Sequence, residues 1–342
     1  MLKWGVLGVA ASMLGGRVLD FLVRLFPTMK RILAWGRAHV RPEGLPNRMM
    51  TFAWQSVTSM IVALIVWDRS EFVLLKYLTP DIRQVYFYSV AFSLAERLLI
   101  TSVIFGSAAG ATIFAQYGRD KSKLPAITAS SFRYLALTSI PVHFIAASLA
   151  VPTLILLYGN QYKGAALVVT LAPLLCLPKA FIGPVQNLLE SMERQSYVII
   201  STVIAGVVDM TVAWIIIPSR GAVGACIGSG AAQILAIGTM WAIGIRIYKV
   251  RLPWAQVAKI TLISVVASLA ALCFAIRLSP VLAIPFGGTA SLIVLFGMLR
   301  QLKVLQPEDS YRFATLIRIL PKPLATSVNR SLFWLISGGD LK

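Results

Sequence analysis

Residues 196–245 read SYVIISTVIAGVVDMTVAWIIIPSRGAVGACIGSGAAQILAIGTMWAIGI, two apolar runs separated by a short turn. The runs, 196–217 and 221–245, are each close to the roughly 20 residues that cross a bilayer as a helix. Pro218 and Gly221 lie between them, and these residue types end one helix and let the next begin. The stretch therefore predicts two membrane-spanning helices joined by a tight turn.

Similar apolar blocks recur along the whole chain. Of its 342 residues, 58% are hydrophobic and only 13% are charged, whereas a soluble domain has about 25% charged residues. The mean hydropathy is +0.79, and strand-period alternation is absent. We therefore predict an all-α fold, a polytopic transmembrane helical bundle with about nine spanning helices. They are expected at 4–26, 50–78, 84–116, 126–157, 164–189, 196–217, 221–245, 255–277 and 281–299.

The net charge of +19, from 32 Lys and Arg against 13 Asp and Glu, has a simple explanation in a membrane protein. Basic residues accumulate in cytoplasmic loops, so no nucleic-acid partner is needed. If the C-terminus is cytoplasmic, twenty basic residues fall on the inner side and five on the outer side. The five are Lys3, Arg83, Lys163, Arg220 and Arg277. We predict a multi-pass protein of the bacterial plasma (inner) membrane with a cytoplasmic C-terminus.

The sequence carries no catalytic motif. It lacks a nucleophile elbow, a phosphate-binding glycine loop and paired Cys or His ligands. Cys176, Cys226 and Cys273 are far apart in apolar stretches and are interpreted as small buried hydrophobes. We expect no enzyme, no cofactor and no metal site.

Lys179 is the most informative charge inside a predicted span. Gly183, Gln186 and Glu190 follow it at helical spacing, and three nearby prolines interrupt the helix. Such broken helices often line transport cavities. Lys179 and Gln186 are therefore candidate pyrophosphate- or anion-binding residues. The alternative is that Lys179 pairs with a carboxylate of a neighbouring helix for structure alone.

Glu96 and Arg97 lie near the middle of the third predicted span. A polar strip runs along that helix, formed by Tyr86, Ser89, Ser93, Glu96, Arg97 and Thr101. A polar face avoids lipid, and the fork of Arg97 suits phosphate oxygens. Arg97 is therefore a second candidate anion ligand. The alternative is an interhelical salt bridge to Asp68 or Glu71.

Asp68, Arg69 and Glu71 cluster in the outer half of the second span, close to Lys76. Together with Glu96 they are predicted to form an ion-pair network that acts as a gate. A purely structural network fits the pattern equally well.

Two further intramembrane charges stand apart from these. Asp209 lies near the centre of the sixth span among small neighbours, so it is a candidate for proton coupling, with structural hydrogen bonding as the alternative. Arg17 shares a helical face with Asp20 and Arg24, and it is a candidate anion ligand.

From about residue 48 to 250 the chain resembles a known transporter family. The resemblance rests on three stretches in order: 67–71 (WDRSE) followed by 86–94 (YFYSVAFSL), then 157–162 (LYGNQY), then 217–225 (IPSRGAVGA). These resemble the C-terminal lobe of polysaccharide and lipid-linked oligosaccharide flippases of the O-antigen translocase type. That family belongs to the multidrug/oligosaccharidyl-lipid/polysaccharide exporter superfamily.

The resemblance implies a division of the chain. Residues 1–26 are expected to be a helix left from a first lobe, 27–49 a basic linker with an amphipathic helix, and 50–250 a six-helix lobe. Residues 251–303 would add two helices, and 304–342 would form a cytoplasmic tail with an amphipathic helix. Most of a first lobe is missing, so either another chain or copy supplies that half, or the gene is a fragment.

The resemblance also implies a function. The family moves undecaprenyl-pyrophosphate-linked oligosaccharide across the inner membrane by alternating access, for polysaccharide, O-antigen and lipopolysaccharide assembly. Its partners would be the lipid-linked oligosaccharide, membrane lipids and glycan-assembly proteins. Two alternatives stay open, a small-molecule cation antiporter of the same superfamily and a non-transporting scaffold of a glycan-assembly complex. An antiporter should have an acidic cavity, whereas the flippase should have a basic one.

Overall fold

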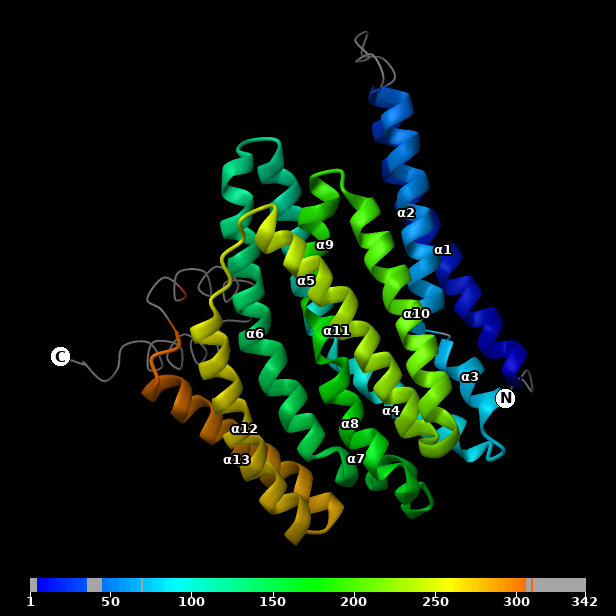
Figure 1. The fold of residues 1–342 in the computed structure, drawn as a ribbon, viewed down its shortest axis with the longest axis vertical. Coiled ribbons are helices and arrows are strands. Elements are labelled where there is room, and N and C mark those ends of the chain that lie inside the picture. The colour runs from blue at the N-terminus through cyan, green and yellow to red at the C-terminus, as the bar shows by residue number, and fades with distance from the viewer. Residues whose placement is uncertain (1–4, 36–44, 69, 306–308, 310–342) are drawn as a thin grey trace, which may run out of the picture. The chain divides into compact units, whose positions relative to one another are not determined.

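The computed structural model describes residues 5–35, 45–68, 70–305 and 309. Among these residues the ordered elements are all helical, as predicted (Figure 1). The α-helices are α1 Gly5–Trp35, α2 Leu45–Asp68, α3 Ser70–Leu78, α4 Arg83–Leu98, α5 Ile100–Tyr117, α6 Leu124–Ser148, α7 Ala150–Tyr158, α8 Ala166–Cys176, α9 Ile182–Ser191, α10 Gln195–Arg220, α11 Ala222–Arg246, α12 Trp254–Arg277 and α13 Pro280–Gln301. Short 3-10 helices are η1 Lys121–Lys123, η2 Asn160–Ala165 and η3 Leu177–Phe181.

The chain divides into two compact units, residues 1–54 and 55–342. In the first unit, α1 differs from the prediction because it continues through Pro27 to Trp35, where a span ending at 26 and a separate amphipathic helix were expected. The predicted amphipathic helix of the tail lies outside the described residues, apart from Asp309.

Seven helical segments of the described chain are long and apolar enough to cross a membrane, and the count rises to eight if a bent pair forms one span. The bent pair is Lys121–Ser148 with Ala150–Tyr158, which meet at 64°. The predicted number was about nine. The first predicted span corresponds to α1, which carries Arg17, Asp20 and Arg24 and is not among the seven or eight.

Two helix contacts hold the second unit together through small residues. At α10–α11, a Cβ on Gly224 would lie 2.9 Å from the backbone of Ile216. At α5–α9, a Cβ on Gly183 would lie 2.9 Å from the Cα of Gly106. Because only glycine permits such close approach, these positions act as helix-packing sites. α12 and α13 pair with each other, and α12 packs on α6 (Figure 1).

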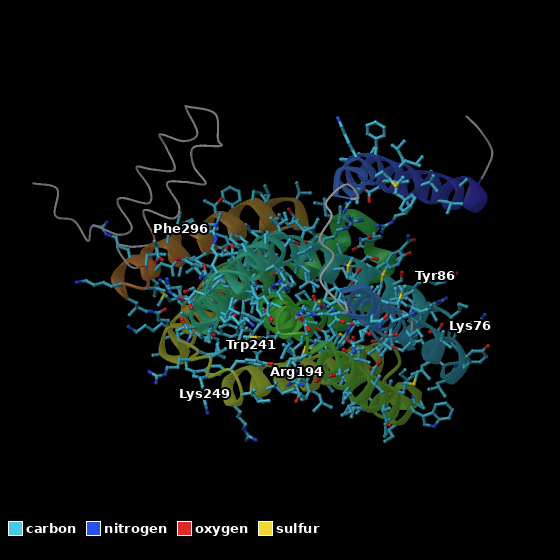
Figure 2. All side chains as sticks on the ribbon, turned by 90° about the horizontal axis from the view of Figure 1, so that it is seen from above. Lys76, Tyr86, Arg194, Trp241, Lys249 and Phe296 are labelled. Carbon is cyan, nitrogen blue, oxygen red and sulfur yellow. The ribbon has the colours of Figure 1, made fainter. Side chains whose placement is uncertain are left out.

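The connections between helices gather at the two ends of this unit as the predicted topology requires. At one end, Gln84 Oε1 accepts a 3.0 Å hydrogen bond from the backbone N–H of Ala222, and the rings of Phe87 and Tyr162 meet at 6.4 Å. At the other end, Arg194 lies beside Tyr248. In projection, Lys76 and Tyr86 lie on one side of the bundle and Arg194 and Lys249 toward the other (Figure 2). We call the end with Gln84, Phe87 and Tyr162 the predicted outer end, because the distribution of basic residues in the sequence predicts that this end faces the outside.

Candidate functional site

One face of α4 is exposed and polar. Tyr86, Ser93 and Arg97 are exposed at spacings of seven and four residues, so they lie along one side of the helix. Among the side chains of α4, Tyr86 is the one large apolar residue that is exposed, at 56%. On α10, by contrast, the exposed side chains include Ile204, Val207 and other large apolar residues typical of a lipid-facing surface. The exposed face of α4 therefore suits an aqueous cavity.

Lys179 reaches this face from a broken helix. The predicted fifth span is α8, η3 and α9, and Lys179 lies in η3 between the two α-helices. Its Nζ is 3.2 Å from Oε1 of Glu96, with the side chains 19% and 40% exposed. The structure thus brings the two predicted residues together, in the interhelical pairing that was the structural alternative for Lys179. Since Glu96 remains partly open, the pair borders the polar face.

Arg97 differs from Lys179 in its surroundings. It is exposed one position after Glu96, at the end of α4, where the helix axis breaks at Leu99 before α5 begins. Its guanidinium makes no hydrogen bond or ion pair with any other residue in the described part of the chain. The salt bridge to Asp68 or Glu71 that was the alternative is therefore not seen, and Arg97 has its full donor set available.

Three other predicted residues are placed differently. The Gln186 amide donates to Glu190 Oε1 at 2.7 Å, within α9, so it is engaged on its own helix. Arg17 is exposed on α1 in the first unit. Arg69 lies outside the described residues, as does the side chain of Asp68, so the gating network predicted around them stays a prediction.

Asp209 is not the isolated carboxylate that was expected. Ser70 Oγ lies 2.9 Å from Asp209 Oδ2 and 3.0 Å from Glu71 Oε2, and all three residues are buried. The other oxygens of the two carboxylates, Asp209 Oδ1 and Glu71 Oε1, have no hydrogen-bond partner among the described residues. A hydroxyl has a single proton, so Ser70 can donate to one carboxylate only. Ser70 Oγ also lies 3.1 Å from the carbonyl oxygen of Val66, so three acceptors compete for that one proton. Proton coupling at Asp209 stays a prediction.

A water-sized cavity of about 20 Å³ lies beside Lys179. Its walls include Tyr88, Lys179, Ser229 and Gln233, from α4, η3 and α11. The Tyr88 hydroxyl has no hydrogen-bond partner among the described residues. A polar space of this size holds about one water molecule.

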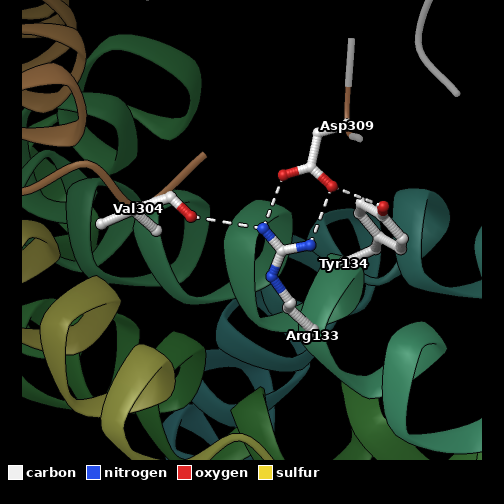
Figure 3. Close-up of polar contacts among 4 residues, drawn as sticks. All are labelled: Arg133, Tyr134, Val304 and Asp309. Atoms are coloured by element: carbon white, nitrogen blue, oxygen red, sulfur yellow. Dashed lines mark hydrogen bonds and ion pairs between the residues drawn. The ribbon is translucent and has the colours of Figure 1, made fainter. Parts of the chain in front are cut away.

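The sequence analysis missed a fourth polar cluster on α6. Arg133 forms a two-pronged ion pair with Asp309, Nη1–Oδ1 at 2.8 Å and Nη2–Oδ2 at 2.5 Å, and also donates to the carbonyl of Val304 (Figure 3). The Tyr134 hydroxyl donates to the same carboxylate at 2.6 Å. The signal in the sequence was an unexplained arginine at the eighth position of the span predicted at 126–157, but its partner is 176 positions away.

Metal binding finds no support in the described part of the chain, where no group of three or more His, Cys, Asp or Glu residues could hold an ion. Cys176 and Cys226 are buried, as predicted. The prediction of burial is wrong for Cys273, which is exposed on α12. An apolar membrane environment allows this, because lipid solvates apolar side chains as well as a protein core does.

Comparison with known proteins places this arrangement in a transporter fold. No family model matches the chain, and no curated protein matches it. Among solved structures, the chain is similar to the lipid II flippase MurJ in an inward closed conformation, with a TM-score of 0.62 and 14% sequence identity. The chain has a MurJ-like fold. The match covers 88% of this chain but 63% of that one, so the chain spans less than two thirds of the neighbour's length.

The likeness bears on two expectations from the sequence. The neighbour is a flippase, a transporter rather than an enzyme, which agrees with the missing catalytic motifs. The transporter fold that the family resemblance implied is confirmed. The comparison does not address whether the chain is of the O-antigen translocase type.

Proposed function

We propose that the protein flips undecaprenyl-pyrophosphate-linked oligosaccharide from the inner to the outer leaflet of the bacterial plasma membrane, in polysaccharide or O-antigen assembly. The observation that carries this proposal is the exposed polar face of α4, on which Arg97 has no partner among the described residues and lies beside the Glu96–Lys179 pair. A charged side chain inside a membrane segment is costly unless it faces water or a ligand. A pyrophosphate would supply the missing partner.

The two cations would take different parts in binding. Arg97 can bind two phosphate oxygens at once through its planar fork, which fixes the orientation of the group. Lys179 would act as a point charge, held in place by Glu96 at 3.2 Å until the phosphate arrives. Glu96 would then exchange its partner, so the ion pair opens when substrate binds.

Alternating access requires two facing walls. The helices of residues 55–305 supply one wall, whose exposed polar face is on α4. We propose that a second chain, or a further segment, supplies the facing wall, and that glycan-assembly proteins deliver the lipid-linked substrate. Proton movement at the Glu71–Ser70–Asp209 cluster would drive the cycle, since two buried carboxylates share one hydroxyl there.

Flipping of a fluorescent polyprenyl-pyrophosphate-linked oligosaccharide in reconstituted vesicles tests the proposal. Arg97→Ala and Lys179→Ala should each reduce flipping at least about tenfold, the scale of one lost charge-assisted hydrogen bond. Lys303→Ala is a matched control, because Lys303 is exposed and outside the site. Unchanged flipping in both site variants would overturn the proposal. Export of a small organic cation instead would favour the antiporter, and no transport of either kind would favour a scaffold.

A further inference from the structure

A second pocket opens at the predicted outer end of the bundle, away from Arg97 and Lys179. It has a volume of about 640 Å³ and lies between the start of α4 and the connection from α7 to α8. Its walls are formed by Asp81, Arg83, Tyr86, Phe87, Gln161, Tyr162 and Gly164. A space of this size accommodates one or two sugar rings, within the range of ordinary small-molecule sites.

The aromatic wall of this pocket is held in place by the fold. Tyr162 packs edge-on against Phe87 at 6.4 Å between ring centroids, and its ring lies tilted against that of Tyr158 at 5.4 Å. Gly164 lies over the Phe87 ring, so close that a Cβ there would be 2.9 Å from ring carbons. Gln84 ties the start of α4 to the α10–α11 turn. The ring of Tyr162 is thus positioned before any ligand arrives.

The polar groups of the pocket include donors with no protein partner. The Arg83 guanidinium makes no hydrogen bond or ion pair with any other residue in the described ranges, although Asp81 is two positions away. Asp81 instead turns its Oδ1 to the backbone N–H of Arg83 at 3.0 Å, which leaves Oδ2 available as an acceptor. Gln161 makes one long bond, 3.4 Å from Nε2 to the Tyr158 carbonyl, and its amide oxygen is open.

This combination of groups matches the chemistry of a saccharide. The faces of aromatic rings carry negative charge density and attract the polarised C–H groups on the apolar face of a sugar. Carboxylate and amide oxygens accept from sugar hydroxyls, and a free guanidinium binds an acidic substituent. A lipid headgroup phosphate would use Arg83 but would have no use for the exposed ring of Tyr86, which is 56% exposed.

The pocket also continues the polar face of α4. Arg83 and Tyr86 lie on the same side of the helix as Ser93 and Arg97, at successive spacings of three, seven and four residues. We propose that this pocket is a saccharide-binding subsite, which holds the glycan of the lipid-linked substrate at the outer end of the path while the pyrophosphate leaves Arg97. This inference rests on the proposed function and adds a position where the sugar is recognised.

Saturation-transfer NMR on the full-length protein in nanodiscs tests the subsite with two soluble sugars. Chitotriose represents a neutral glycan and trigalacturonate an acidic one. Wild-type protein should transfer saturation to the ring protons of both sugars. Tyr86→Ala should reduce the transfer at least about fivefold for both, whereas Tyr86→Phe should keep it. Arg83→Gln should reduce it only for trigalacturonate, by about tenfold in affinity, because only that sugar offers a charged partner.

Two variants outside the pocket serve as matched controls. Tyr77→Ala removes a tyrosine that is 78% exposed on α3, and Arg277→Gln removes an exposed cation at the end of α12. Neither should change the transfer. Equal transfer in all variants, or none from the wild type, would overturn the subsite. Binding of inorganic phosphate that needs Arg83, without any sugar binding, would overturn it too, in favour of a phosphate site.

A further variant separates this inference from the proposed function. Arg97→Ala lies outside the pocket, so it should stop flipping and leave sugar binding unchanged. Sugar binding by a wild-type protein that flips no lipid would support the subsite and overturn the proposed function. Flipping without sugar binding in the pocket would do the reverse.

Discussion

The guanidinium of Arg133 forms a bidentate ion pair with the carboxylate of Asp309, which follows α13 in the chain. Both side chains are nearly closed to the surface, at 11% and 1% exposed. The pair fastens the segment after the last helix to α6, in the middle of the chain. Arg133 also donates a hydrogen bond to the carbonyl of Val304, so it binds that segment at two positions, Val304 and Asp309.

Loss of one member of this pair should destabilise the protein. Arg133→Met or Asp309→Ala leaves a buried charge without its partner, and such changes cost about 3 kcal/mol. The double variant should cost less than the sum of the two, because it leaves no unpaired charge. Thermal unfolding in detergent measures this, with the exposed Lys303→Met as a control that should shift stability by under about 0.5 kcal/mol. Additive effects of the two single variants would show that the ion pair does not stabilise the fold.

The role of Lys179 can be separated from its pairing with Glu96. If the ion pair serves structure alone, the neutral double variant Glu96→Gln, Lys179→Met removes both charges together and should flip lipid nearly as well as the wild type. We expect instead that it remains impaired about tenfold, because the cation itself binds the pyrophosphate. The vesicle flipping assay decides between these outcomes. Equal protein amounts in the vesicles, measured by blotting, keep the comparison valid.

The predicted orientation can be read from cysteine labelling. In a Cys273→Ser background, which removes the exposed native thiol, Gln161→Cys should react with a membrane-impermeant maleimide in intact cells. Arg119→Cys should react only after the membrane is permeabilised, since it lies in a connection on the predicted inner side. Both positions are exposed, so accessibility within the protein does not limit the reaction. The reverse labelling pattern would place the C-terminus outside the cell.

The sequence was sufficient for the helices but not for their contacts. Apolar blocks and turn residues located each predicted span close to a helix or broken helix of the structure, because membrane thickness and helix geometry fix the length of such a block. Which charges meet depends on how each helix is rotated and which helices are its neighbours. The sequence therefore predicted a carboxylate partner for Lys179 as one alternative but could not identify it as Glu96, 83 positions away.

The acid cluster shows the same limit more sharply. Asp209 was recognised as a costly intramembrane charge from its position alone. Its neighbour Glu71 was assigned to a different network, because nothing in the sequence places the end of α2 and the start of α3 against the middle of α10. The side chain that joins the two carboxylates, Ser70, carries no distinctive pattern at all. Polar contacts across helices of this kind are set by packing, which periodicity does not report.

The protonation of the Glu71–Asp209 pair gives the last prediction. Ser70 has one proton and three acceptors, Asp209 at 2.9 Å, Glu71 at 3.0 Å and the Val66 carbonyl at 3.1 Å, so its hydroxyl cannot donate to both carboxylates. Two buried carboxylates that share a site do not both ionise easily. Among the described residues, no Lys or Arg forms an ion pair with either of them. The cluster should therefore gain and lose a proton as the cavity opens to either side.

Asp209→Asn keeps the size and hydrogen bonding of the side chain but cannot ionise. We expect wild-type flipping in vesicles to follow an imposed pH gradient, and we expect the Asn variant to lose that dependence while it remains folded. Glu71→Gln should behave in the same way, since either change removes the sharing of a proton. Glu190→Gln is the matched control, because Glu190 is a carboxylate bound to Gln186 and separate from the pair. An Asp209→Asn protein whose flipping rate keeps the wild-type pH profile would show that Asp209 only bonds α10 to its neighbour.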